Sequence, residues 1–135
     1  MAKVTGLGAT IAVDDSGGTA RTISNDISNY SQSTPRGVQD ITGVDKSAME
    51  RQLLLADYQL TLNGLVNTTA STGSHAVFRT VPSTSVARTV TITVASQVLA
   101  SEILFSDYNL TRAQDGSLVF TAPGALADGT VPTWA

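Results

Sequence analysis

The sequence predicts a mainly β domain with one short α-helix. Two stretches, residues 58–63 and 88–94, alternate apolar and polar side chains with the period of two that a half-buried strand requires. Clusters of Asp, Ser and Gly stand between such runs, where hairpin turns would lie. At 135 residues the chain is long enough to bury a core, so we expect a single domain spanning residues 1–135.

The first elements are short and polar. Residues 8–13 alternate and stop at the Asp–Asp–Ser–Gly–Gly cluster of residues 14–18, which predicts a hairpin. Residues 21–30 are too polar for a buried strand and lead to Thr34–Pro35, so they predict one partly exposed strand. Beyond the proline the chain enters an arm, residues 36–57, that we interpret as an extended loop between strands.

The arm is the most charged part of the chain. Of 19 charged residues (8 basic and 11 acidic), seven lie between residues 36 and 57. Residues 47–56 leave two alternatives open, a helix capped by Asp45 or Ser47 and a loop that leads straight into the next strand. The seven charged residues are Arg36, Asp40, Asp45, Lys46, Glu50, Arg51 and Asp57.

The second half contains the predicted helix and the clearest strands. Ser74 is a candidate N-cap for a helix over residues 74–81 that ends at Pro82. The strand predicted over residues 102–112 changes its apolar phase midway, which indicates a β-bulge or burial on both faces. An Asp–Gly turn then predicts a hairpin with residues 118–122. The tail, residues 123–135, has no periodicity, and Trp134 near its end needs a surface to dock on, in this chain or in the next.

Composition excludes several classes of function. Without cysteine there is no disulfide framework, thiolate nucleophile or Cys-based zinc site. A net charge of −3 with eight basic residues offers no cationic stripe for gripping phosphates. No apolar run approaches the roughly 20 residues of a membrane span, and the first residues lack an apolar signal stretch, so we expect synthesis in a cytoplasm.

The surface composition favours an assembled protein. Charged residues make up 14% of the chain against a usual value of about a quarter, while Ser and Thr together number 33. Interfaces between subunits are depleted in lysine and glutamate, so a surface largely covered by neighbours fits this composition. A neutral monomer rich in hydroxyl-bearing strands is the alternative.

Candidate chemistry is sparse, and we expect no catalytic residue, metal site or cofactor. Ser74–His75 lacks an orienting acid and a nucleophile elbow. Residues 6–8, Gly–Leu–Gly, precede a strand instead of following one, unlike a phosphate-binding loop. Asp14–Asp15 with Asp26 could bind a hard cation, but a hairpin turn explains the pair more simply.

Several blocks of sequence, in order, resemble the major tail tube proteins of long-tailed (siphovirus-type) bacteriophages, especially those of actinobacterial hosts. The most specific block is residues 40–51, Asp–Ile–Thr–Gly–Val–Asp–Lys–Ser–Ala–Met–Glu–Arg. The other blocks are residues 4–8, 75–78 and 115–118, together with the Trp close to the C-terminus.

The resemblance implies a β-sandwich of two packed sheets flanked by one helix, with a long inter-strand loop. It implies hexameric rings in which one sheet of each subunit joins a β-barrel around a lumen, and rings that stack into the tail tube through which DNA is ejected without specific binding. It also implies a place in the virion tail and partners of the tape-measure, tail-tip and tail-terminator classes. The arm then corresponds to the loop that contacts neighbouring subunits or the adjacent ring. Its seven charges have mixed signs, which suits contacts that fix the register and orientation of one copy against another.

A channel-lining sheet should present small hydroxyl or amide side chains without cations that would trap phosphate. We therefore expect Tyr58, Leu60, Leu62 and Phe105 inside the sandwich. The lumen-facing candidates are Gln59, Thr61, Asn63, Asp107, Asn109 and Thr111.

Three other classes remain as alternatives: a capsid decoration or other virion structural protein, the tube protein of a contractile injection device, and a small hydrolase.

Overall fold

The computed structural model describes residues 3–135. The strands are β1 (Thr10–Asp14), β2 (Ala20–Thr22), β3 (Ile27–Ser33), β4 (Arg36–Asp40), β5 (Arg51–Ala56), β6 (Gln59–Leu65), β7 (Arg88–Val94), β8 (Gln97–Phe105), β9 (Asn109–Arg112) and β10 (Leu118–Leu126). The helical segments are α1 (Ser74–Phe78) and two 3-10 turns, Ser24–Asp26 and Val81–Ser83. Among the described residues no helix is long and apolar enough to cross a membrane.

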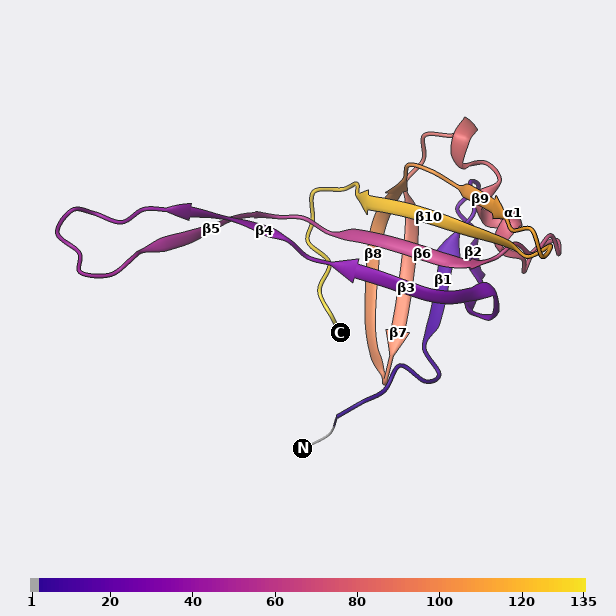
Figure 1. Ribbon diagram of the computed structural model, residues 1–135, viewed down its shortest axis with the longest axis horizontal. Coiled ribbons are helices and arrows are strands. Elements are labelled where there is room, and N and C mark those ends of the chain that lie inside the picture. The colour runs from indigo at the N-terminus through magenta and orange to yellow at the C-terminus, as the bar shows by residue number, and fades with distance from the viewer. Residues whose placement is uncertain (1–2) are drawn as a thin grey trace.

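Most of the described strands belong to one antiparallel sheet that folds over on itself. Its order is β2-β1-β7-β8-β10-β6-β3, with β9 also paired to β10, while β4 and β5 pair separately. In Figure 1, β1, β7 and β8 form one layer, and β3, β6 and β10 cross them in a second. The prediction of a mainly β fold with one short helix is confirmed, and the two expected sheets are layers of one continuous sheet.

The two layers are joined where β10 pairs with the end of β8. Gly124 lies opposite Phe105, and Leu126 lies opposite Ile103. A Cβ added at Gly124 would stand 2.4 Å from Cγ2 of Ile103, closer than non-bonded carbon atoms approach. The lack of a side chain at Gly124 therefore lets the two strands meet at this corner.

The core lies between the layers and follows the alternation of the strands. Leu60 and Leu62 of β6 are buried, as is Tyr58 just before it, while Phe105 packs against them partly exposed. These are the four side chains expected inside. Burial of its ring raises the pKa of Tyr58 to about 12, and its hydroxyl donates to Oε1 of Gln32 over 2.5 Å.

Helix α1 packs its last two residues into the core. Val77 and Phe78 are fully buried, and the ring centroid of Phe78 is 5.2 Å from that of Phe105 and 5.3 Å from that of Phe120. The predicted helix is confirmed but is shorter, because the chain turns into a 3-10 segment at Val81. Gly73, not Ser74, takes the N-cap position, so that part of the prediction is wrong.

Two buried charged residues hold the ends of α1. Oδ2 of Asp26 accepts a hydrogen bond from the Ser74 amide over 2.9 Å. At the other end, Nη1 of Arg88 donates to the Val77 carbonyl over 2.6 Å, and Nη2 donates to Oγ1 of Thr80 over 2.9 Å. These bonds satisfy terminal groups that so short a helix cannot pair internally.

Two predicted strands are each divided in the structure. Residues 21–30 form β2, a 3-10 turn and the start of β3, because the chain leaves the β1 layer and enters the β6 layer there. Residues 102–112 form the end of β8 and then β9, with a break at residues 106–108. The apolar phase changes at this break because β8 pairs mainly with β7 whereas β9 pairs only with β10.

Replacing Phe78 by Ala should destabilise the free subunit by about 3–5 kcal/mol, because the substitution empties the centre of the aromatic cluster. Urea unfolding followed by circular dichroism measures this change. Leu55→Ala is the matched control, since Leu55 is 93% exposed and should unfold at the wild-type midpoint. Equal midpoints for the two variants would contradict this description of the core.

Candidate functional site: the arm and the polar sheet face

The arm of residues 36–57 is a β-hairpin that extends far from the body (Figure 1). Residues 51–56 are neither helix nor loop, because β5 pairs along β4 with Val38 opposite Leu53 and Asp40 opposite Arg51. A helix of this length would have no surface on which to bury an apolar face, whereas the hairpin continues directly from β3 and into β6. A hydrogen bond of 2.9 Å from the Asp57 amide to the Pro35 carbonyl closes its base.

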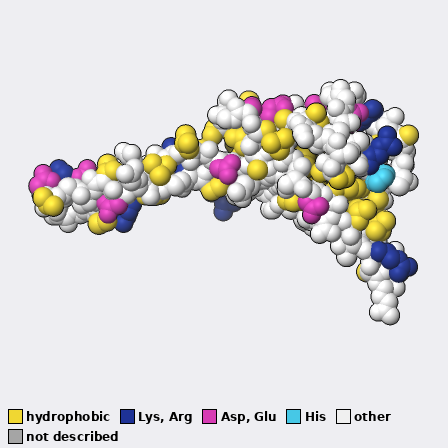
Figure 2. Space-filling model, turned by 90° about the horizontal axis from the view of Figure 1, so that it is seen from above, with side chains coloured by type: hydrophobic (Ala, Val, Ile, Leu, Met, Phe, Trp, Pro, Cys, Tyr) yellow, Lys and Arg dark blue, Asp and Glu magenta, His cyan; other side chains and the backbone are white. Residues whose placement is uncertain are grey.

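The apolar side chains of the arm are exposed on both of its faces. Val38 and Leu53 form a cross-strand pair on one face, and Leu54 lies beside Gly37 on the other. Figure 2 shows hydrophobic side chains along the arm and a group of charged side chains at its far end. The exposed apolar residues are Val38, Ile41, Val44, Met49, Leu53, Leu54 and Leu55. Such a concentration of exposed apolar surface marks an interaction site.

The seven charged residues of the arm fall into two groups. Three shape the hairpin: Arg36 donates through Nε to the Leu54 carbonyl, Oδ1 of Asp57 accepts from the Tyr58 amide, and Oδ1 of Asp40 accepts from Thr42. The Thr42 hydroxyl and amide hold the pKa of Asp40 below its usual range.

The other four charged residues, Asp45, Lys46, Glu50 and Arg51, are exposed. Nζ of Lys46 lies 3.6 Å from Oδ2 of Asp45 and 3.9 Å from Oε1 of Glu50. Exposed pairs at these distances contribute little to stability, so this group is free to meet another molecule.

Five of the six lumen-facing candidates share one face of the second layer. Gln59, Thr61 and Asn63 alternate with buried residues along β6, and the register places Asn109 and Thr111 of β9 on the same face through β10. Asp107 lies in the connection before β9, exposed but outside the ladder. The structure therefore brings five of the candidates together and leaves the sixth at their margin.

A chain of side-chain hydrogen bonds crosses this face. Nδ2 of Asn63 donates to Oδ1 of Asn29 over 2.8 Å, and Oγ1 of Thr121 donates to Oδ1 of Asn63 over 2.8 Å. The sequence prediction missed the contributions of β3 and β10; in β3 only Ile27 and Tyr30 mark the inward face, so the alternation is weak. The polar face comprises Asn29, Ser31, Ser33, Gln59, Thr61, Asn63, Asn109, Thr111 and Thr121, and the same register also places the apolar residues Leu65, Val119, Pro123 and Ala125 on it.

The second layer ends in two strand edges that pair with nothing else in the described part of the chain. β3 pairs only with β6, and β9 pairs only with β10. An exposed strand edge presents backbone donors and acceptors that can pair with another chain.

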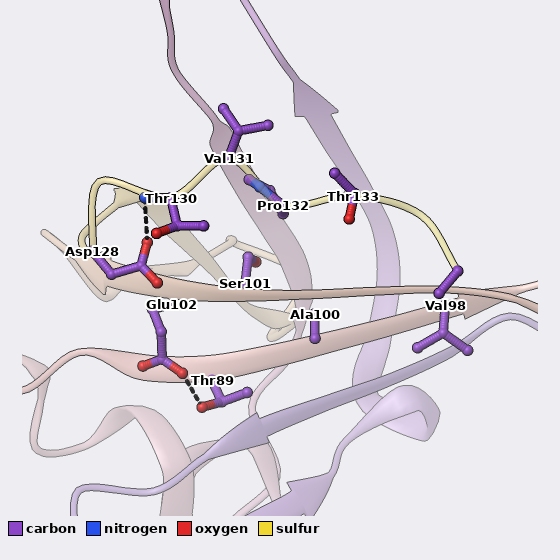
Figure 3. Close-up of a pocket in the computed structure, with 11 residues that line it drawn as sticks. Thr89, Val98, Ala100, Ser101, Glu102, Asp128, Thr130, Val131, Pro132 and Thr133 are labelled. Carbon is purple, nitrogen blue, oxygen red and sulfur yellow. Dashed lines mark hydrogen bonds between the residues drawn. The ribbon is translucent and has the colours of Figure 1, made fainter.

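The C-terminal tail crosses the open edge of β8. Strand β10 runs to Leu126, so the part of the predicted tail before residue 127 is regular, because it pairs with both β6 and β8. The last residue, Ala135, exchanges two backbone hydrogen bonds of 2.9 Å with Val98. Between these points the tail bridges a cavity of about 370 Å³, and the buried Ser101 hydroxyl at its wall has no hydrogen-bond partner among the described residues (Figure 3). Trp134 lies near Val4 and Val94 of its own chain and stays about half exposed.

The residues weighed for other chemistry have structural partners. The Ser74 hydroxyl donates to the Leu65 carbonyl, and Nδ1 of His75 lies 3.1 Å from the Tyr108 hydroxyl. Oδ1 of Asp15 accepts from the Gly17 and Thr19 amides within the first hairpin turn. Asp26 instead holds the start of α1.

Comparison with known proteins relates the chain to others through its fold. No protein-family profile and no curated protein sequence matches it. Among solved structures it is similar to a chain from the tail of an empty gene transfer agent particle with C6 symmetry, with a TM-score of 0.77 and 13% identity over 99% of both chains. It is also similar to a chain from the virion of a native gene transfer agent particle, with a TM-score of 0.73 and 10% identity over 93% of this chain and 95% of that one.

A chain from the six-fold symmetrised baseplate of the anti-feeding prophage gives a TM-score of 0.70 and 13% identity, over 100% of this chain and 97% of that one. At these identities the likeness is one of fold. The fold is thus one that occurs in the tails and baseplates of such particles, and it spans the arm as well as the body.

Replacing Asn63 by Ala should destabilise the free subunit by about 1–2 kcal/mol, because two side-chain hydrogen bonds across three strands are lost. Thermal and urea unfolding measure the change. Ser31→Ala, on the same face, should leave stability close to that of the wild type. If both variants unfold alike, the hydrogen-bonded row does not stabilise the sheet.

Proposed function

We propose that this protein is the tube subunit of a phage-type tail, in which hexameric rings stack into the conduit for DNA ejection. The main support for the proposal is that a subunit with this fold leaves the apolar side chains of its arm exposed. Fold likeness to chains from particles of C6 and six-fold symmetry supports the ring order. The protein then acts through contacts between copies and has no catalytic role.

Rings close through the two free edges of the second layer. The edge of β3 in one subunit pairs with the edge of β9 in the next, which continues the sheet around a barrel. Closure removes both free edges of the second layer, and six identical contacts around an axis achieve it. The polar face then lines the lumen or the outer wall of this barrel, and its chemistry favours the lumen.

The polar face suits a channel through which DNA slides. Its nine polar side chains are amides and hydroxyls, with no Lys or Arg to form ion pairs with phosphates and no Asp or Glu, and the apolar side chains among them carry no charge. Asp107 stands at the margin of this face, where it adds a repulsive charge. DNA passes such a wall without specific binding.

The arm contacts other subunits of the tube. Burial of its apolar residues against neighbours supplies affinity, while Asp45, Lys46, Glu50 and Arg51 set register and orientation. The ends of such a tube expose arms and ring faces, so terminator and tail-tip proteins cap it and a tape-measure protein occupies its lumen during growth. The protein is made in the host cytoplasm and resides in the virion tail.

A second candidate function is the tube of a contractile injection device. One of the similar structures is a chain from a baseplate and not from a tail, so this alternative stays beside the first. A sheath partner distinguishes the two candidates, because it copurifies with the tube only in a contractile device. A capsid decoration protein would instead bind capsids and form no tubes.

Electron microscopy of the purified protein over a range of concentrations tests the proposal. We expect hollow tubes or six-fold rings. A protein that remains monomeric at every concentration and salt condition would contradict the function.

Replacing Leu53 by Asp should abolish tube formation without destabilising the subunit, because Leu53 is exposed in the monomer and needs to be covered in the tube. Sedimentation measures the assembled fraction, and thermal unfolding measures stability. Leu53→Met is the control and should assemble. Tubes of Leu53→Asp in wild-type yield would show that this face of the arm stays in solvent.

Replacing Thr61 and Asn63 by Lys should preserve tubes but slow DNA passage, because 12 added cations per hexameric ring, two in each of six subunits, would bind phosphates. Ejection rates of phage carrying the variant provide the measurement. Gln at both positions is the uncharged control. Unchanged ejection rates would show that the polar face does not line the lumen.

A further inference from the structure

We propose that a cationic cleft beside α1 receives the tip of the arm of a second copy, with the Asp45 carboxylate bound to the Arg79 guanidinium. This inference rests on the proposed function, because it requires that copies assemble. It identifies a site on the body that the arm of the next copy recognises.

The cleft lies between the first hairpin, the loop after β6 and α1. It has a volume of about 220 Å³, enough for one acidic side chain with part of its turn. Its wall carries hydroxyl groups from Thr68 and Ser71 next to His75, Arg79 and the ion pair of Arg21 with Asp15. The hydroxyl groups and Arg79 can donate hydrogen bonds to a carboxylate, whereas Nδ1 of His75 already lies 3.1 Å from the Tyr108 hydroxyl.

Arg79 is the cation in this cleft without a carboxylate partner. Arg21 is committed to Asp15, whose Oδ2 accepts from Nε over 3.1 Å and from Nη2 over 3.0 Å. The Thr19 amide and Arg21 hold the pKa of Asp15 below its usual range, so this pair stays ionised. Arg79 is exposed, and within residues 3–135 it forms no ion pair.

The arm tip offers the complementary charge. Residues 40–50 contain three carboxylates and one lysine, a net charge of −2. Asp40 is engaged by Thr42, and the Glu50 side chain is 45% exposed beside Lys46. Asp45 is 76% exposed, and its contact with Lys46 is long at 3.6 Å. Asp45 is therefore the tip carboxylate most available to a partner.

The cleft and the tip lie at opposite ends of the molecule. Figure 1 shows the arm reaching one end of the long axis while α1 and β2 lie at the other. In Figure 2 basic side chains stand beside the single histidine, at the opposite end from the charged tip of the arm. A copy shifted along this axis brings its tip to the cleft of the next, and such a heterologous contact repeats without closing.

The ion pair between Arg79 and Asp45 fixes how the arm docks on the next copy more than it adds to the affinity between copies. Arg79 can bind the Asp45 carboxylate with two parallel hydrogen bonds, which fixes the angle at which the tip enters. The apolar residues of the arm supply the area, and the charge pair selects where the arm docks.

A charge-reversal cycle tests this contact. Arg79→Asp and Asp45→Arg should each raise the critical concentration for tube formation about tenfold or more, because each places like charges in contact. The double variant should assemble at a concentration close to that of the wild type. Lys3→Asp is the control for a simple change in net charge and should assemble normally, and thermal unfolding should be unchanged throughout because the three residues are exposed.

The inference would be overturned if either single variant assembled normally, or if the double variant assembled no better than the singles. In both cases, tubes formed by the wild-type protein would still support the proposed function. A wild-type protein that never assembles would overturn the proposed function itself. Titration with inorganic phosphate separates a third outcome: phosphate binding that is lost in Arg79→Asp, with assembly unaffected, would make the cleft an anion site and refute docking of the tip.

Discussion

The arm cannot bury its own apolar side chains within the subunit. A two-stranded hairpin has two faces and no second layer, so its apolar residues have nothing in the subunit to pack against. The body satisfies its own apolar groups between two layers, with a glycine at the corner and α1 at one end. The body of the subunit thus buries its apolar side chains by itself, whereas the arm leaves its own exposed.

Strands β3 and β6 link these two parts. Both continue into the arm at one end, and in the body they form the free edge and the polar face of the second layer. A contact that moves the arm therefore acts on the same strands that would close a ring. In the proposed tube, this continuity would let one pair of strands couple contacts along the tube to contacts around it.

Most body strands could be predicted from the sequence because each has one face in the core. The alternation in residues 58–63 and 88–94 directly reflects that burial, and in residues 58–63 it also placed Gln59, Thr61 and Asn63 on one face. The arm strands could not be predicted, since β5 has no buried face and its conformation depends on pairing with β4. The breaks near residues 23 and 107 occur where the chain changes layers, which a local pattern does not reveal.

Buried polar residues were equally beyond prediction. Nothing local distinguishes Arg88 from an exposed arginine at the start of a strand, although it holds the end of α1. The cleft at Arg79 likewise combines three segments that are distant in the sequence. Such sites follow from tertiary packing, and only the folded chain shows them.

Hydrogen exchange on the free and the assembled protein tests most directly whether neighbours complete the arm. We expect amides of β4, β5 and the tip to exchange quickly in the free subunit and to become strongly protected in tubes, while those of β7 and β8 are protected in both. Arm amides that exchange equally fast in free and assembled protein would contradict it.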